Sequence, residues 1–400
     1  MQQFLLETPP DVSEILNLIS KAKHTYVKFL SANDLGLTGS HQRGIYLSKD
    51  CWPFFLDAPG PDGENVERLM SIDWGEGRRT PAMFKWYGAS KREYRITQTT
   101  ALFRHREERS LGALFLLLDA SDTHGELLGR VLESDDDIEQ VLNFLGITPA
   151  ETAQTLNFDL NQRLLPFCET YLKETGGSFP DTADISRRSQ RVFEDLYGPT
   201  RIDEPDTALL NLIEIEYTLF RYIERRVYEP LLTKQFERVE DLLAVSLEIN
   251  NRRKSRAGLA LENHLQYLFR RLMIPHGYQI ATEDNRKPDF IFPGSEAYRD
   301  PAFPGERLFF LAAKTTCKDR WRQILNEAER IPVKYLCTLQ QGFSSAQLAE
   351  MRDAKVVPVI PSAYHSHCKQ EDRALLLTVA EFLERVLAAN GTVPDLFAVT

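Results

Sequence analysis

Long apolar runs are missing from this chain of 400 residues. No uninterrupted apolar stretch approaches the roughly 20 residues that a membrane-spanning helix needs. Residues 1–15 also lack the basic start and the long apolar core of a signal peptide. These absences argue against a membrane partner and predict a cytoplasmic protein.

Cysteine is scarce, and its five copies include no pair with the Cys-x-x-Cys spacing of a zinc ribbon. An odd number of cysteines also argues against a disulfide framework, whereas reduced thiols fit the cytoplasm. His365, His367 and Cys368 could ligate a metal. Because no second cluster stands at a suitable spacing, a solvated loop is the favoured interpretation of this segment.

Positive charge is in deficit, since the formal net charge is −10. The charge is unevenly spread, however. Residues 250–330 contain 15 Lys and Arg against 10 Asp and Glu, and residues 85–109 contain seven against three. Compensating acid lies in ESDDDIE, at 133–139. Two basic zones in an acidic chain indicate two anion-binding surfaces, with ordinary solvated faces as the alternative.

A chain of this length predicts two domains. Up to about residue 110, short strand-like runs such as HTYVKFLS, MFKWYG and REYRITQTT alternate with glycine-containing turns, which predicts a β-barrel or a curled sheet. The stretch GLTGSHQRG has neither a Gly-x-Gly-x-x-Gly pattern nor a Walker loop, so no nucleotide cradle is expected. Helices are predicted around 136–145 and 161–175.

The pattern changes after a loop-like boundary, GGSFPDTADISRRSQ at 176–190. A long helix is predicted from residue 207. Two more are predicted between 239 and 273, separated by the basic NRRKSR. Strands DFIF, LFFLAAK, KYLCTL and VVPVIP then alternate with helices at 319–331, around 344–354 and at 375–389. This alternation predicts an α/β sheet flanked by helices.

The candidate catalytic residues stand at the ends of two expected strands. Asp289 follows a proline at the start of one strand, and Lys314 ends the next, about 25 residues later. Adjacent strands of this kind bring a carboxylate and an ammonium together at a sheet edge. Metal-dependent phosphodiester hydrolases of the PD-(D/E)xK form use this pair. The carboxylate holds Mg²⁺, and the lysine steers the nucleophile and neutralises charge growing on phosphorus.

The second acid of this pattern is missing, because Ala312 stands two residues before Lys314 and alanine cannot bind a metal. Glu327 is the expected replacement. It is predicted on the helix after the strand, on the face that points back at the sheet. Glu262, on the preceding helix, is a further candidate acid. For each acid taken alone, a surface salt bridge is the alternative.

Three stretches, NNRRKSRAGLALENHLQYLF, RKPDFIFPGSEAY and AAKTTCKDRWRQILNEAERI, resemble the EcoRII family of type II restriction endonucleases. The N-terminal SANDLGLTGSHQRGIY and SKREYRIT resemble the effector domain of that family. The likeness spans both ends of the chain and is weak between roughly residues 110 and 250.

The resemblance implies a multidomain α+β fold. An N-terminal DNA-binding β-pseudobarrel of the plant B-three type would occupy residues 1–175, and a linker would occupy 176–206. A C-terminal α/β restriction-endonuclease-like domain of the PD-(D/E)xK type would occupy 207–400.

The resemblance also implies a homodimer that cuts double-stranded DNA with Mg²⁺ at a short CCWGG-type site and needs a second DNA copy as allosteric effector. Asp289 and Glu327 would be metal ligands, Lys314 the catalytic lysine and Glu262 an auxiliary catalytic acid. A cognate methyltransferase would act on the same site but need not bind the protein.

Residues that follow the catalytic lysine read the target site in relatives. Here they are Lys318, Asp319 and Arg320, whose side chains suit guanine O6 and N7 and cytosine N4. The alternative is a helix start with Asp319 as its N-cap. Tyr217 matches a stacking position for an extruded base. Ile213 stands where an arginine is expected, and a core role is the alternative for Tyr217.

Residues that match effector-DNA positions of the family lie in the N-terminal half. They are His41, Tyr46, Lys91, Arg92, Glu93 and Arg95. Taken alone, KREYR would be a solvated strand face. The sequence therefore predicts a Mg²⁺-dependent, site-specific DNA endonuclease that a second DNA activates. A structure-specific repair nuclease and a non-cleaving DNA-binding protein on the same fold are the alternatives.

Overall fold

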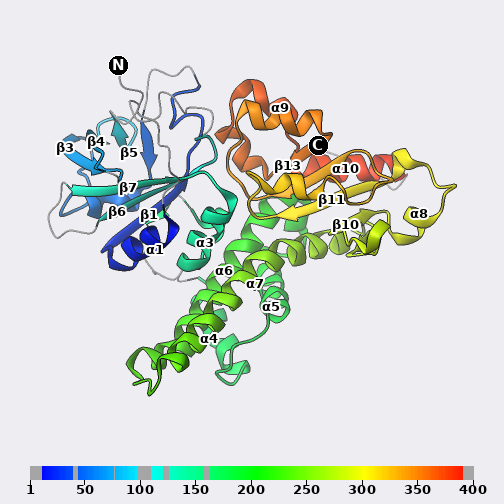
Figure 1. Cartoon of the computed structure of the whole chain (residues 1–400), viewed down its shortest axis with the longest axis horizontal. Coiled ribbons are helices and arrows are strands. Elements are labelled where there is room, and N and C mark those ends of the chain that lie inside the picture. Colours follow the sequence, from blue (N-terminus) through cyan, green and yellow to red (C-terminus); the bar gives the residue numbers. More distant parts are fainter. Residues whose placement is uncertain are drawn as a thin grey trace.

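The computed structural model describes residues 11–38, 44–75, 77–97, 110–119, 126–152, 154–155 and 163–390. Figure 1 shows two lobes side by side and a helical arm that projects below them. One lobe is built on a curled sheet and the other on a smaller sheet flanked by helices, which confirms the predicted α+β fold of two domains. Among the residues described, no helix is long and apolar enough to cross a membrane.

Eight strands form the N-terminal sheet, in the order β2-β5-β4-β3-β7-β6-β1-β8. Their bounds are β1 His24–Phe29, β2 Ile45–Leu47, β3 Asn65–Asp73, β4 Arg79–Tyr87, β5 Tyr94–Thr97, β6 Leu114–Asp119, β7 Glu126–Leu132 and β8 Gln154–Thr155. Neighbouring strands are antiparallel except β3 and β7.

Both faces of the sheet are apolar around β1 and β6, where successive side chains of a strand point to opposite faces and both sets are buried. Phe115 and Leu117 of β6 enter the cluster inside the curl, whereas Leu116 joins a second cluster with helices α1 (Val12–Lys21) and α3 (Asp135–Leu145). Helix α3 was predicted. It begins with three acidic residues, which favour a helix N-terminus, and it ends at Gly146, whose φ of +68° suits glycine.

The C-terminal lobe has a mixed sheet in the order β13-β12-β11-β10-β9, with β11, β12 and β13 mutually parallel. The strands are β9 Gly277–Tyr278, β10 Phe290–Phe292, β11 Phe309–Lys314, β12 Lys334–Thr338 and β13 Val356–Val359. The helices are α4 Leu165–Glu174, α5 Thr182–Tyr197, α6 Pro205–Tyr228, α7 Val239–Arg271, α8 Ser295–Arg299, α9 Ser345–Asp353 and α10 Val379–Asn390.

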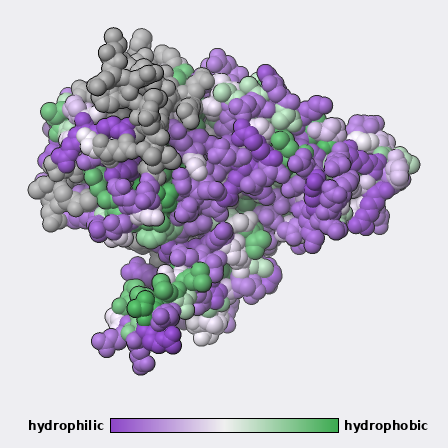
Figure 2. All heavy atoms as spheres, in the orientation of Figure 1, coloured by the Kyte–Doolittle hydropathy of each residue, from purple (hydrophilic) through white to green (hydrophobic). Residues whose placement is uncertain are grey.

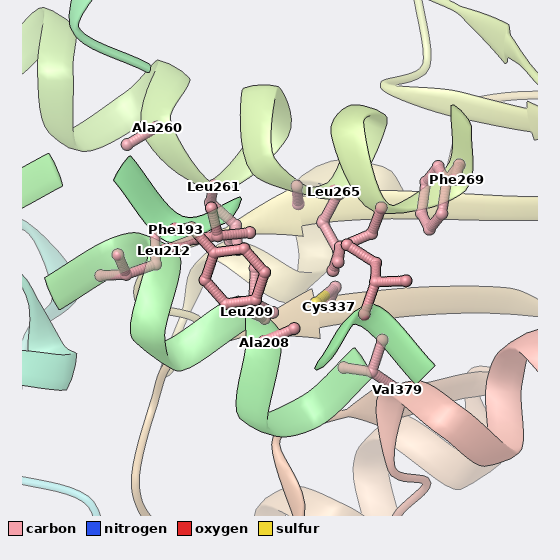
Figure 3. Packing of buried hydrophobic residues seen from close by; sticks show 14 of the residues in the cluster. Phe193, Ala208, Leu209, Leu212, Ala260, Leu261, Leu265, Phe269, Cys337 and Val379 are labelled. Atoms are coloured by element: carbon pink, nitrogen blue, oxygen red, sulfur yellow. The ribbon is translucent and has the colours of Figure 1, made fainter. Parts of the chain in front are cut away.

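This sheet separates two apolar clusters. Leu311 and Ala313 of β11 face one cluster, to which helices α4, α5, α6, α7 and α10 contribute. Phe310 and Ala312 face the other, with Trp321. Figure 3 shows the first cluster from close by. Its labelled side chains are Phe193, Ala208, Leu209, Leu212, Ala260, Leu261, Leu265, Phe269, Cys337 and Val379. The strand that carries Lys314 is therefore fixed by packing on both faces.

Two elements differ from the sequence-based expectation. Residues 239–271 form a single helix of 33 residues, so the predicted break at NRRKSR is wrong. Its basic residues are compatible with a helix, and Arg256 turns inward and is 1% exposed, with its guanidinium 5.0 Å from the ring of Phe220. The segment 176–206, expected to be a linker, contains α5, which packs against α6 and α7. Where the two domains divide stays a prediction.

The two lobes touch closely. A Cβ atom on Gly112 would lie 2.1 Å from the carbonyl oxygen of Gly342, so the two backbones meet without a side chain between them. Beside this contact, the Gln341 amide donates to the Pro149 carbonyl at 2.6 Å and to the Thr152 hydroxyl at 3.2 Å. Buried hydrogen bonds of this kind define one docked arrangement of the lobes.

The solvated loop predicted for residues 365–368 is wrong. His365 and His367 lie on a short 3-10 helix, η8 (Ser362–His367), and Cys368 is buried. The carbonyl of His367 accepts from the N–H of Ala32 at 2.8 Å. This segment therefore packs at the interface between the lobes.

Candidate active site

Asp289 and Lys314 meet at the edge of the C-terminal sheet. Strands β10 and β11 are antiparallel, and Phe290 pairs with Leu311. The Asp289 Oδ2 atom consequently accepts from the Ala313 N–H at 2.8 Å and from the Lys314 Nζ at 3.2 Å. Asp289 is 8% exposed. Backbone pairing alone fixes this carboxylate beside this ammonium.

The position of the missing acid is filled by packing. Ala312 is fully buried, in the apolar cluster that contains Phe310 and Trp321. Position 312 lies on the same face of β11 as Lys314, because side chains two residues apart in a strand share a face, but the methyl group of alanine cannot bind a metal. A metal at this site would therefore need an acid from another element.

Glu327 supplies a carboxylate near this pair. Burial raises its pKa, and so does the negative charge of Asp289, while the ammonium of Lys314 lowers it. The charges of Asp289 and Lys314 thus both act on the Glu327 carboxylate. Mutual repulsion of two carboxylates favours a bound cation.

The α-helix predicted for residues 319–331 is wrong. Only a short 3-10 helix forms, η7 (Arg320–Ile324), and Glu327 follows it in a turn. The reason lies in the next residues. Ala328 has a φ of +49°, which an α-helix cannot contain. The ammonium of Lys334 also binds the carbonyls of Glu327 and Ala328, which removes them from any helical ladder.

Glu262 lies on α7 at the same site. Its Oε2 atom accepts from the Tyr278 hydroxyl at 2.9 Å and from the Gln279 amide at 3.2 Å. Burial raises the pKa of Glu262, and the charge of Asp289 raises it further. Helix α7 and strand β9 thus hold a third acidic group, which is easier to protonate than an exposed glutamate.

The donor set fits Mg²⁺ only in part. Within the described parts of the chain, no three His, Cys, Asp or Glu side chains converge on a common metal position. Asp289 and Glu327 provide two carboxylates. Mg²⁺ binds through one or two carboxylates, keeps several waters and takes further oxygens from substrate phosphates. The site therefore matches a metal that DNA helps to hold, and not a preformed all-protein cage.

The N-terminal lobe binds part of the predicted target-reading segment, whereas the side chain of Asp319 is exposed. The Asp135 carboxylate of α3 accepts from the backbone N–H of Arg320 at 2.9 Å and also from that of Asp319. Arg320 is paired through its guanidinium with Asp136 at 3.1 Å and with Glu139. Asp319 does begin η7, but its side chain makes no capping bond. Asp135 caps the helix from the other lobe instead.

Lys318 adjoins this contact, and its carbonyl accepts from the Gln347 amide at 3.1 Å. Tyr217 is half-buried against the apolar cluster of the N-terminal lobe, and the guanidinium of Arg256 lies 5.4 Å from its ring. Ile213 is buried in the helical core. The role of Tyr217 as a target-site contact stays a prediction.

The predicted effector residues lie at one end of the N-terminal sheet. Tyr46 of β2 pairs with Arg95 of β5, and the Arg95 guanidinium binds Glu93 at 2.7 Å. Lys91 and Arg92 are exposed in the turn between β4 and β5. His41 lies outside the described residues. The five described positions share one edge of the sheet.

Sequence reasoning missed several residues of the site. The acidic run 133–139 was noted only as compensating charge, although Asp135, Asp136 and Glu139 bind the segment after Lys314. The one feature of the sequence that could have predicted this contact is the opposite charge of the acidic run 133–139 and the basic segment 318–322. Lys334 was also missed, because a lysine at the start of an apolar strand resembles an exposed strand end.

A nuclease of the restriction-endonuclease-like fold is the class that this sheet and its Asp–Lys pair define. A sequence model of the family described as EcoRII C terminal matches residues 220–383, and one described as restriction endonuclease EcoRII, N-terminal, matches residues 20–150. The chain belongs to the EcoRII family of type II restriction endonucleases, and this confirms the resemblance seen in the sequence. The protein is therefore a site-specific deoxyribonuclease.

The type II restriction enzyme EcoRII of Escherichia coli is 33% identical over 405 residues, which cover 95% of this chain and 98% of that protein. The type II restriction enzyme SsoII of Shigella sonnei is 24% identical over 170 residues, 40% of this chain and 54% of that protein. Metal-depleted Ecl18kI bound to uncleaved, modified DNA aligns over 58% of this chain and 86% of its own, with 21% identity and a TM-score of 0.46.

Proposed function

We propose that this enzyme cuts double-stranded DNA at a short CCWGG-like site with Mg²⁺, and that a second copy of the DNA activates it. The observation that carries the catalytic part is the hydrogen bond between the Asp289 carboxylate and the Lys314 ammonium, 3.2 Å long. This is the arrangement that metal-dependent phosphodiester hydrolysis needs.

Asp289 and Glu327 would hold the metal, which supplies an activated water and charge neutralisation when it is bound. Lys314 donates toward the same carboxylate oxygen and can turn its ammonium to the attacking water or the phosphate oxygen. As the oxygen–phosphorus bond forms and the bond to the leaving deoxyribose oxygen breaks, negative charge grows beside Lys314. Glu262, whose pKa is raised, is suited to hold a proton near the leaving or attacking oxygen.

Target reading is assigned to Lys318, Asp319 and Arg320. Their segment leaves the end of β11 directly after Lys314. Specificity and chemistry would therefore be coupled through a few residues of backbone. Arg or Lys donates to guanine O6 and N7, and Asp accepts from cytosine N4. Two basic groups and one acid thus suit G·C pairs.

Activation by a second DNA is supported by the contact between α3 and Arg320. While Asp136 and Glu139 are paired with Arg320, its guanidinium cannot reach a base edge. An effector that favours an arrangement without this contact would raise cutting, as any ligand shifts an equilibrium by its differential affinity. Effector binding is assigned to His41, Tyr46, Lys91, Arg92, Glu93 and Arg95.

The working form is a homodimer in this proposal. The arm exposes apolar side chains along one stripe of α7: Val239 is 69%, Leu243 60% and Leu247 61% exposed. Figure 2 shows the apolar patch at the arm. Monomers rarely leave such a stripe uncovered. An antiparallel second copy of α7 would cover these leucines.

A digestion experiment tests the proposed function. The full-length protein is incubated with Mg²⁺ and plasmids that contain or lack CCWGG sites, and the fragment ends are sequenced. Discrete fragments whose ends share one sequence are expected. A smear, or cleavage confined to branched junctions, would contradict site-specific cutting.

A further inference from the structure

Glu327 is held by a turn and not by a helix or a strand. Its N–H donates to the Ile324 carbonyl at 3.1 Å, and the next residue, Ala328, has a φ of +49°. A left-handed backbone is unfavourable for alanine, so surrounding contacts have to maintain it. A carboxylate on β11 itself would be fixed by the sheet. With alanine at position 312, the replacement acid needs separate support.

Lys334 provides the first support. It begins β12 and is only 4% exposed. Its ammonium donates to the Ala328 carbonyl at 2.6 Å and to the Glu327 carbonyl, and it lies 5.1 Å from the ring centre of Phe310. A buried ammonium is unfavourable unless it is well hydrogen-bonded. An apolar residue at position 334 would pack without the free-energy cost of removing an ammonium from water. The two carbonyls that this ammonium binds are therefore the reason for a lysine here.

A second support comes from the loop before β10. Arg286 donates through Nη1 to the Asn326 carbonyl, and this atom lies 3.4 Å from a carboxylate oxygen of Glu329. Glu283 accepts from the Glu329 N–H at 3.3 Å. The Tyr298 hydroxyl in turn donates to Glu283 at 2.7 Å. Four consecutive residues, 326–329, are thus bound by side chains from two separate parts of the fold.

From these contacts we propose that Lys334, Arg286 and Glu283 form a clamp that positions the Glu327 carboxylate for metal binding, with Lys334 as the central positioning residue. The inference rests on the proposed role of Glu327 as a metal ligand. Outer contacts of this kind change metal affinity or activity by roughly 10–100-fold when they are removed. The clamp replaces the rigidity that β11 would have given an acid at position 312.

Mn²⁺ binding to the complex of the full-length protein with an uncleavable site-bearing duplex, measured at equilibrium by electron paramagnetic resonance with the duplex alone as the blank, tests the clamp. Lys334→Met keeps the aliphatic stem and removes the ammonium. It is expected to weaken Mn²⁺ binding about 10-fold or more. The Mg²⁺ concentration for half-maximal single-turnover cleavage should rise in parallel. Arg286→Met changes a less buried residue and should weaken Mn²⁺ binding by a smaller factor. This variant replaces Lys334→Met in the test if Lys334→Met does not fold.

Arg307→Met is the matched control. Arg307 also donates to backbone carbonyls, those of Ala389 at 2.9 Å and Asn390 at 3.4 Å, which belong to α10 and not to the segment 326–329. It should lower thermal stability without changing Mn²⁺ affinity. If Lys334→Met behaves like this control, with a lower melting temperature and unchanged metal binding, Lys334 is only a structural residue and the clamp is refuted.

Glu327→Gln separates this inference from the function on which it rests. If Glu327 is a ligand, Glu327→Gln weakens Mn²⁺ binding, and adding Lys334→Met to it causes no further loss, because both changes act through one carboxylate. Full additivity of the two changes would overturn the clamp and leave Glu327 as a ligand. Unchanged Mn²⁺ binding in Glu327→Gln would overturn the ligand assignment and, with it, the clamp.

Discussion

The Asp135 carboxylate accepts a hydrogen bond from the backbone N–H of Arg320 at 2.9 Å, across a separation of 185 residues in the chain. The contact links the first turn of α3 in the N-terminal lobe to the segment that leaves the catalytic strand. Asp136 and Glu139, on the same helix, pair with the guanidinium of Arg320. DNA that binds Arg320 has to displace these carboxylates.

Weakening this contact should activate the enzyme without an effector. We expect Asp136→Asn combined with Glu139→Gln to cut a single-site plasmid faster than the unmodified protein, because the variant leaves Arg320 without its charged partners. Coupling free energies between sites correspond to about 5–150-fold, so an acceleration of about 5-fold or more is expected. The initial cutting rate is measured with and without an added site-bearing oligonucleotide.

The matched control for this variant is Glu64→Gln with Glu306→Gln, which makes the same change of charge at two exposed positions away from Arg320. It should leave the single-site rate unchanged. Equal acceleration by both variants would mean that net charge, and not the contact with α3, limits cutting.

Loss of the sheet-edge pair should abolish chemistry and spare binding. We expect Asp289→Ala and Lys314→Ala to reduce single-turnover cleavage by about 100-fold or more, since each removes a group that stabilises developing charge. Affinity for site-bearing DNA should persist in both variants. If a variant retains more than about a tenth of the cleavage rate of the unmodified protein, the assignment of that residue to the catalytic site is wrong.

Arg320→Ala should relax specificity at one base pair. The expected loss is about 1–3 kcal/mol of discrimination at a G·C pair, measured as the ratio of affinities for cognate and single-mismatch duplexes. Arg322→Ala is the control, since Arg322 is more exposed and pairs with Glu350. If Arg320→Ala weakens cognate and random DNA equally, Arg320 contacts phosphate and does not read a base.

Lys91→Ala combined with Arg92→Ala should reduce activation by added oligonucleotide. Both residues lie in an exposed turn, so the change should alter stability by no more than about 0.5 kcal/mol. If they bind effector phosphates, the salt dependence of effector affinity should weaken by about one unit of slope for each contact. Unchanged activation and unchanged salt dependence would place the effector surface elsewhere.

Leu243→Glu combined with Leu247→Glu should convert a dimer into a monomer. Both leucines are exposed on the arm, so burying them against a second copy is favourable and two new carboxylates would prevent it. Light scattering during gel filtration gives the mass directly. If the unmodified protein is already a monomer at micromolar concentration, the arm does not carry a stable interface.

The sequence by itself determined that Asp289 and Lys314 would lie together. Asp289 stands directly before one short apolar run and Lys314 ends the next, and pairing of these runs as neighbouring antiparallel strands brings the two side chains to the same end of the pair. The sequence also showed that the second acid of the pattern is missing, because position 312 is alanine and an alanine side chain cannot bind a metal. Family membership followed from long stretches of matching residues.

Tertiary structure alone decided how the replacement acid is held and what covers the reading segment. Whether residues 319–331 continue as a helix depends on Lys334, which binds the carbonyls of Glu327 and Ala328 from a neighbouring strand. Whether Arg320 is available depends on acids about 180 residues earlier in the chain. Local propensity and periodicity act over a few residues. Contacts between distant segments depend instead on how the two lobes pack, and no local pattern encodes that packing.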